Sequence, residues 1–111
     1  MKIALSAKKH DLYNQLDEHF GRAELFFIYN TETERYTEVS NKRASSAPQG
    51  AGIQTVELLI RNEVDTVVTG TVGPKAQKAL EAAGITLYTT KQHTVAMALN
   101  ELLSREETIH S

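Results

Sequence analysis

The order of apolar and polar residues along this chain predicts strands in the first half and alternating helices and strands in the second half. Short runs of β-branched and aromatic residues are typical of strands, whereas apolar residues three and four positions apart are typical of helices. The predicted strands are residues 2–7, 25–29, 35–39, 66–69 and 85–89, and the predicted helices are residues 53–61, 74–83 and 94–103. Residues 8–18 are expected to form a structured loop and residues 104–111 a frayed tail.

The segment Val64–Leu80 contains the clearest local pattern, a buried strand followed by a glycine turn and a helix. The β-branched run Thr66–Thr69 is typical of a parallel strand that helices cover on both faces. Gly70 and Gly73 lie in the turn, and Pro74 occupies the first helical position, where its missing N–H costs no hydrogen bond. Units of this kind form ligand crevices at the carboxyl edge of α/β sheets.

This order of elements predicts an α/β fold in which helices cover a mixed five-stranded sheet. Right-handed crossovers make the strands of the second half parallel to one another. The simplest closure places the fourth strand beside the first, which gives the strand order 3-2-1-4-5 with the second strand antiparallel. The loops that carry His19, Gly50–Gly52 and Gly70–Gly73 should then meet at the carboxyl edge of the sheet.

Several features of this edge favour an anionic ligand. The predicted helices that begin at Ile53 and Pro74 direct unpaired N–H groups and a partial positive charge toward it. Basic side chains also lie in these loops or in the first helical turns, namely Lys8, Lys9, Arg22, Lys42, Arg43 and Lys75. For Lys42 and Lys75, simple solvation of a loop is the favoured interpretation. Residues 41–52 are rich in Ser, Ala, Gly and Pro and are expected to form a mobile loop, and its closure as a lid is left open.

Length and composition indicate a single globular domain over residues 1–111. The hydrophobic fraction of 41% and the charged fraction of 23% are ordinary for a soluble protein, and the net charge of −2 argues against a nucleic-acid partner. No apolar run suits a signal peptide or a membrane span, so we expect a cytoplasmic protein with no membrane partner. The sequence has no cysteine, which excludes disulfides, thiolate zinc sites and the usual thiolate ligation of an iron–sulfur cluster.

The tetrad His19-Phe20-Gly21-Arg22 is the strongest candidate for a binding motif. The imidazole of His19 can bind a metal, and the guanidinium of Arg22 can donate paired hydrogen bonds to a carboxylate or a phosphate. The alternative is structural: Phe20 anchors the loop in the core, Gly21 permits a turn and His19 caps it. On the residues alone the structural interpretation is favoured, because a site must be argued from its geometry.

The remaining motifs indicate little specific chemistry. Residues Gly50–Thr55 lack the third glycine and the preceding strand of a dinucleotide fingerprint, and Gly70–Lys75 lack the spacing and the ending of a phosphate-binding P-loop. His10 is a weaker second candidate for a metal ligand. The sequence shows no pair of a nucleophile and a general base, so nothing in it indicates an enzyme.

Three blocks of the sequence resemble the dinitrogenase iron–molybdenum cofactor-binding domain family, which includes nitrogenase accessory proteins and small stand-alone proteins. The blocks are HFGRAELFFIYN, GAGIQTVELL and VDTVVTGTVGPKAQKALEAAGITLY, and the resemblance extends from Met1 to about Leu103. It implies a ribonuclease-H-like fold with three α/β/α layers. It also implies a carrier or chaperone for iron–molybdenum cofactor or an iron–sulfur precursor, which is not an enzyme. The positions that match the family blocks are His19, Arg22, Gly50, Gly52, Gly70, Gly73 and Pro74.

The leading hypothesis is therefore a small binding protein that holds an anionic metal–sulfur cofactor or its precursor at the carboxyl edge. The expected metal contact is His19, and the expected cofactor-binding residues are Lys8, Lys9, His19, Gly21, Arg22, Gly50, Gly52, Gly70 and Gly73. The expected partners are this cargo and cofactor-assembly proteins, and the protein is expected to be a monomer or a weak homodimer. The alternative is a regulatory or interaction domain that binds a small anionic metabolite without a metal.

Overall fold

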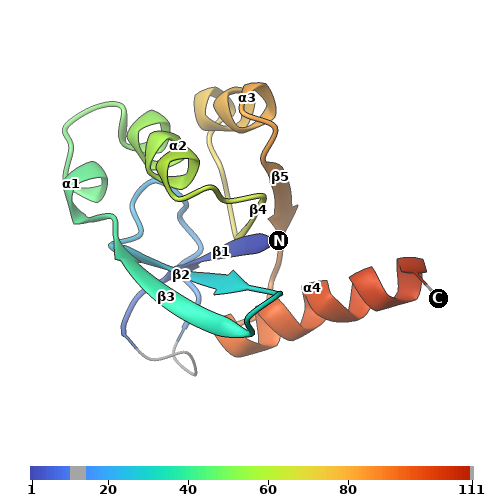
Figure 1. Cartoon of the computed structure of the whole chain (residues 1–111). Coiled ribbons are helices and arrows are strands. Elements are labelled where there is room, and N and C mark those ends of the chain that lie inside the picture. The colour runs from blue at the N-terminus through green and yellow to red at the C-terminus, as the bar shows by residue number, and fades with distance from the viewer. Residues whose placement is uncertain (11–14, 111) are drawn as a thin grey trace.

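The computed structural model describes residues 1–10 and 15–110, with side chains up to residue 105. The strands are β1 (Lys2–Ala7), β2 (Leu25–Asn30), β3 (Arg35–Ser40), β4 (Thr66–Thr69) and β5 (Thr86–Thr89). They form one sheet of five strands in the order β3-β2-β1-β4-β5 (Figure 1). β1 pairs antiparallel with β2 and parallel with β4, β3 is antiparallel to β2, and β5 is parallel to β4. The predicted α/β fold, with its strand order and antiparallel second strand, is confirmed.

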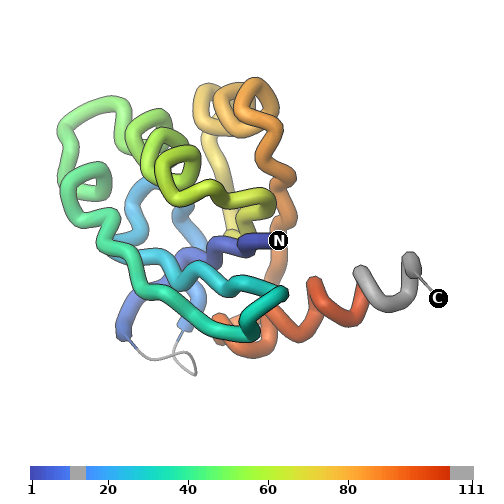
Figure 2. Tube along the Cα trace, viewed as in Figure 1, coloured from blue at the N-terminus to red at the C-terminus, as the bar shows by residue number. Residues whose placement is uncertain are grey.

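Helices cover both faces of this sheet and so form the two outer layers. Helices α1 (Lys42–Ser45), α2 (Ala51–Arg61) and α3 (Pro74–Ala82) lie over one face, and α4 (Val95–His110) lies over the other (Figure 1). Figure 2 shows α2 and α3 side by side, in agreement with the close contacts between them. The three-layer α/β/α arrangement implied by the family resemblance is confirmed.

Alternation along the central strands divides the hydrophobic core between the two faces of the sheet. Leu5 and Val68 belong to the cluster under α4, whereas Ala4 and Val67 belong to the cluster under α2 and α3. Every residue of Thr66–Thr69 is buried, as predicted for a parallel strand covered on both faces. β1 and β4 therefore position their carboxyl ends rigidly for the loops that follow them.

The connection from β3 to α2 is more ordered than the sequence indicates. The prediction of one continuous loop over residues 41–52 is wrong, because this segment contains α1 and because α2 begins at Ala51. Asn41 is buried, and its amide nitrogen donates to the carbonyl of Ala23 and to the hydroxyl of Thr55, both at 2.9 Å. This buried polar anchor holds the start of the connection against β2 and α2.

Helix α4 continues to His110, whereas the sequence predicts a helix end near Leu103 and a frayed tail from residue 104. The tail contains Arg and Glu residues with high helix propensity, which allows the helix to continue. The loop predicted over residues 8–18 lies partly outside the described residues, at positions 11–14, and its described part contains no helix. Across the part of the chain that the structure describes, no helix has the length and apolar character that crossing a membrane requires.

Candidate functional site

The segment before β2 and the turn after β4 lie side by side at the carboxyl edge of the sheet. The N–H and the hydroxyl of Thr71 both donate to the carbonyl of Glu18, at 2.6 and 3.0 Å, and the N–H of Phe20 donates to the carbonyl of Thr71 at 3.2 Å. His19 and Thr71 form an isolated parallel bridge. The predicted meeting of these two loops at one edge is confirmed.

Two glycines bring the start of α2 to the same edge. A Cβ atom on Gly21 would lie 2.9 Å from the nitrogen of Gly52, and a Cβ on Gly52 would lie 2.9 Å from the Cβ of Ala76 in α3. A Cβ on Gly70 would lie 2.7 Å from the Cα of Glu18. These three glycines are required where parts of the edge touch one another, which leaves no room for a ligand at those three points.

The other two predicted glycines lie in open space. Gly50 precedes α2 with a φ of 74°, a left-handed conformation that favours glycine, and Gly73 precedes α3 with an ordinary extended conformation. A Cβ atom would meet nothing within 4 Å at either position. The space beside Gly50 and Gly73 is therefore where the structure leaves room for a ligand near the starts of α2 and α3.

A buried pair of hydroxyl groups supports the edge from below, and sequence reasoning missed it. The Ser6 hydroxyl donates to the carbonyl of Asp17 at 2.6 Å and accepts a hydrogen bond of 2.8 Å from the Thr69 hydroxyl. Ser6 and Thr69 are fully buried, so both hydroxyls are desolvated, and among the described residues these contacts satisfy them. The available signal was a polar residue near the carboxyl end of each of two apolar strands.

His19 is held by the carboxylate of Asp17, a residue that the sequence analysis did not select. The N–H of His19 donates to Asp17 Oδ1 at 2.9 Å, and its ring Nδ1 lies 3.5 Å from the same oxygen. Because Nδ1 lies beside this carboxylate, Nε2 is the ring nitrogen left for an incoming group. The imidazole is 63% exposed, so this nitrogen can bind a group that arrives from solution.

Arg22 also lies at this edge, where it contacts the segment after α1. Its Nη1 donates to the carbonyl of Ser45 at 3.0 Å and to the carbonyl of Ala47 at 2.8 Å. Arg22 therefore links the His19 turn to residues 46–50, which lead into α2. The guanidinium carries positive charge at the edge while one of its nitrogens performs this structural role.

Lys8 and Lys9 are exposed at the end of β1. The N–H of Lys8 donates to the carbonyl of Gln15 at 3.3 Å, and its Nζ lies 3.4 Å from Gln15 Oε1. Lys8 lines a pocket of about 390 Å³ together with Glu18, Gly70 and Thr71. Of the two lysines, Lys8 is therefore the one that the structure places in a hollow of the edge.

The described residues offer few ligands for a metal. Among residues 1–10 and 15–105, no three side chains of His, Asp or Glu are grouped so that they could hold a metal ion together. His19 and Asp17 form a pair, and Glu18 beside them contributes its carbonyl to Thr71. A metal–sulfur group bound here would contact an open surface through few protein ligands.

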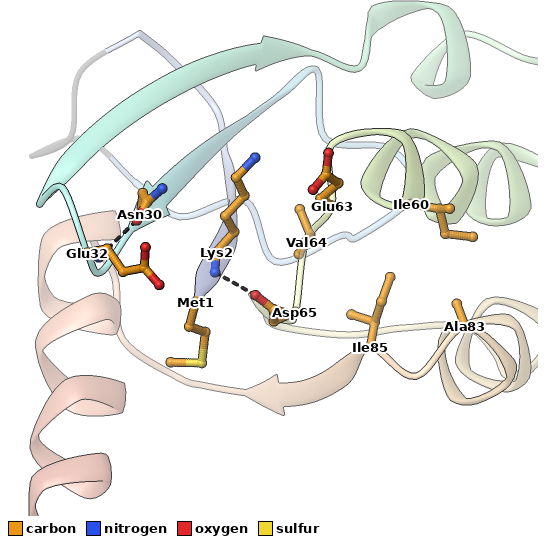
Figure 3. A pocket seen from close by; sticks show the side chains of 10 residues that line it. All are labelled: Met1, Lys2, Asn30, Glu32, Ile60, Glu63, Val64, Asp65, Ala83 and Ile85. Atoms are coloured by element: carbon orange, nitrogen blue, oxygen red, sulfur yellow. Dashed lines mark hydrogen bonds between the residues drawn. The ribbon is translucent and has the colours of Figure 1, made fainter.

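A different pocket lies at the opposite edge, where the parallel strands begin. Figure 3 shows its lining, with the side chain of Lys2 extending among residues from β2, from α2 and from the segment before β4. The N–H of Lys2 donates to Asp65 Oδ2 at 2.8 Å, and its Nζ donates to the carbonyl of Asn62 at 3.3 Å. This pocket of about 460 Å³ shares no residue with the His19 edge, and α/β sheets bind ligands at the carboxyl ends of their strands.

Comparison with known proteins identifies relatives over most of the chain. A sequence model described as dinitrogenase iron–molybdenum cofactor matches residues 1–105. An uncharacterised protein of Methanocaldococcus jannaschii is 31% identical over 90 residues, which cover 79% of this chain and 73% of that protein.

Two solved structures share the fold at appreciable sequence identity. The apo form of the orange protein from Desulfovibrio gigas is 34% identical, with a TM-score of 0.89 over 93% of this chain and 87% of that one. A putative NifB protein from Thermotoga is 29% identical, with a TM-score of 0.82 over the same shares. The resemblance of the three sequence blocks is thus confirmed, and the chain belongs to the dinitrogenase iron–molybdenum cofactor family.

Proposed function

We propose that this protein is a non-catalytic carrier that binds an anionic metal–sulfur cofactor or its precursor, of the iron–molybdenum or iron–sulfur type, at the carboxyl edge. The observation that carries the proposal is the exposed imidazole of His19, held by Asp17 on a turn that Thr71 joins to β4. A single exposed metal-binding side chain that is held rigidly suits reversible binding, because few protein groups have to be ordered when the cargo binds. The family match and the relation to the orange protein support the same conclusion.

Each group at the edge has a defined role in this proposal. His19 contacts a metal of the cargo through Nε2, and Arg22 and Lys8 balance its negative charge. The N–H groups at the starts of α2 and α3, beside Gly50 and Gly73, donate to sulfur or carboxylate groups of the cargo. The cargo is a passenger received from cofactor-assembly proteins, so the carrier needs neither a nucleophile nor a closed coordination sphere.

The test is anaerobic incubation of the protein with isolated iron–molybdenum cofactor, followed by gel filtration and analysis for iron and molybdenum. The wild-type protein should carry both metals through the column, and His19→Ala should lose most of them. His10→Ala is the matched control, because His10 is also exposed but contacts Glu38 of β3 instead. Absence of co-eluting metal, or equal retention by His19→Ala, would reject the carrier.

A second candidate function is a domain that binds a small anionic metabolite without a metal. It is favoured by the absence of a grouped metal-ligand set among the residues described. Thermal unfolding in the presence of nucleotides and carboxylates separates the two, because a ligand that prefers the native state raises the midpoint. Stabilisation by such a metabolite, with none by the isolated cofactor, would establish the second candidate.

A further inference from the structure

A groove of mixed polar and apolar lining runs beside β5 and α4, and its smaller part adjoins the turn that carries His19. It consists of two adjoining pockets of about 800 and 390 Å³. The pockets share Gly70, Thr90, Lys91, Gln92 and His93, and the larger one is also lined by Tyr88, Glu101 and Arg105. We call this feature the β5–α4 groove.

A hydrogen-bond network orders the side of the groove that α4 contributes. Glu101 accepts hydrogen bonds from Tyr88 at 2.6 Å, from Gln92 at 2.8 Å and from Thr90 at 3.4 Å. The Nη1 of Arg105 donates to the Tyr88 hydroxyl at 3.0 Å, and its guanidinium lies 5.2 Å from the centre of the Tyr88 ring. The bonds from Tyr88 and Gln92 lower the pKa of Glu101, so its carboxylate is ionised and already satisfied within the protein.

The charged side chains that line the groove give it a net positive charge. The lining includes three cationic side chains, Lys8, Lys91 and Arg105, against the two carboxylates of Glu18 and Glu101. Lys91 is exposed, and its ammonium forms no hydrogen bond or ion pair with the described residues. A positive excess in a chain whose net charge is −2 favours a ligand that carries carboxylates.

The larger pocket reaches the edge strand β5 at Tyr88 and Thr89. Among the described strands β5 pairs with β4 alone, and the N–H groups of Thr86 and Thr90 donate at 2.9 and 3.0 Å to the carbonyls of Asp65 and Thr69. Because main-chain groups alternate along a strand, the N–H and C=O of Leu87 and Thr89 face the open side. An exposed edge of this kind can accept an additional extended strand.

We propose that the β5–α4 groove binds an extended acidic segment of a partner protein, which adds as a strand to the open edge of β5. The main chain of the segment pairs with Leu87 and Thr89, and its carboxylates face Lys91 and Arg105. A long and open groove suits a peptide better than a drug-sized molecule, whose sites are mostly apolar and enclosed. The contacts that carry this proposal, at Leu87, Thr89, Lys91 and Arg105, are not among the residues assigned to the cargo, although the smaller pocket also contains Lys8.

The probe for this site is a synthetic nine-residue peptide of alternating Thr and Glu, with blocked termini, titrated into isotope-labelled protein and followed by NMR. Amide signals of residues 87–93 should shift, and exchange of the Leu87 and Thr89 amides with solvent should slow. The same peptide with Lys in place of Glu should cause neither change. Binding of the acidic peptide should weaken as salt is raised, because its charges are screened.

Three variants locate the binding determinants. Lys91→Glu should lower the affinity for the acidic peptide by roughly three- to tenfold, the range expected for reversing one exposed charge. Thr89→Pro removes an outward N–H while leaving the ladder to β4 intact, and it should abolish the slowed exchange at Leu87. Lys78→Glu, an equal charge reversal on the exposed surface of α3, should leave the affinity unchanged.

Several results would overturn this proposal. Shifts that the acidic and basic peptides cause equally, or an affinity that Lys91→Glu leaves unaltered, would exclude recognition of acidic groups. Protection of Leu87 and Thr89 that depends on protein concentration without peptide would assign the edge to a second copy of the chain. Shifts at Lys91 and Arg105 with inorganic phosphate, without slowed exchange at Leu87, would assign the groove to a small anion.

Discussion

Close contacts at three glycines determine how the carboxyl edge is built at the scale of single residues. Gly21, Gly52 and Gly70 are among the residues predicted from the sequence to bind the cofactor. In the structure, a Cβ atom added to any of the three would lie 2.7 to 2.9 Å from an atom of a neighbouring segment. A glycine in a loop can serve either purpose, and only its spatial neighbours decide between them.

A matched pair of serine substitutions tests this distinction. Gly70→Ser forces a Cβ against the main chain of Glu18, so it should lower the free energy of unfolding by about 1–3 kcal/mol, as overpacking does. Gly73→Ser enters open space at the N-cap of α3, where Ser is favoured, and should be neutral or stabilising. Urea unfolding of both variants gives the comparison, and equal effects would contradict it.

His19 illustrates what residue identity alone can indicate. The sequence singled out the HFGR tetrad because imidazole and guanidinium groups suit an anionic metal group. It left open whether His19 is a ligand or a cap, and it did not include Asp17. The contact of Asp17 with the N–H and the ring of His19 depends on the fold of this turn, and it explains how the histidine can be both held and exposed.

At the scale of elements, Arg22 joins the segment before β2 to the connection between α1 and α2. Both of its described hydrogen bonds go to main-chain carbonyls, at Ser45 and Ala47. These carbonyls belong to the end of α1 and the residues after it, where helical partners are lacking. The position of residues 46–50 therefore depends on a side chain more than twenty residues earlier in the sequence.

Removing this link should release the segment locally. In Arg22→Met, the amides of Ser46, Ala47, Gln49 and Gly50 should exchange with solvent faster, by on the order of tenfold, because two hydrogen bonds to a charged group are lost. Hydrogen-exchange mass spectrometry resolves this segment from the rest. Arg43→Met, the same change on the exposed surface of α1, is the control and should leave the exchange rates unaltered.

The contact between α4 and β5 should make stability depend on pH in the acid range. The bonds from Tyr88 and Gln92 hold the folded-state pKa of Glu101 below its ordinary value of 4.5. The stabilisation that ionised Glu101 gives the folded state is therefore present above the unfolded-state pKa and is lost as the pH falls through the lower folded-state pKa. The sign follows from the unfolded chain binding the proton first.

The difference in unfolding free energy between the wild-type protein and Glu101→Gln should accordingly be larger at pH 7 than at pH 3. Urea unfolding at the two pH values measures it. Glu81→Gln, on the exposed surface of α3, serves as the control. A difference for Glu101→Gln that is independent of pH would mean that the network contributes nothing through ionisation.

At the scale of the whole molecule, the two hydrophobic clusters share the central strands. Leu59 of α2 lies in one cluster and Leu99 of α4 in the other, on opposite faces of the sheet. β1 contributes Ala4 to the first cluster and Leu5 to the second. Loss of either cluster therefore exposes a face of the same strands, and the domain should unfold as one unit.

Tyrosine fluorescence can test this cooperativity, since Tyr29 and Tyr88 pack against the cluster under α4. Leu59→Ala removes a fully buried side chain from the opposite face and should cost about 2–5 kcal/mol. The unfolding midpoint reported by tyrosine should fall together with that reported by far-UV circular dichroism. Separate transitions would show that the two faces unfold independently.

The sequence by itself determined the order of the elements, the arrangement of the sheet and the edge at which the loops meet. These features follow from local patterns, because a buried strand needs apolar β-branched residues and a crossover between parallel strands has one hand. The resemblance of three sequence blocks, in one order along the chain, also identified the family.

Only the tertiary structure decided which residues perform which task at that edge. The pairing of Thr71 with Glu18, the support of Asp17 by Ser6 and the link from Arg22 to Ala47 join residues that are distant in sequence. The groove beside β5 likewise depends on the tertiary structure, because residues of α4 form part of its lining. Hydrogen bonds and close contacts of this kind depend on distances between segments, which no periodicity within a segment can specify.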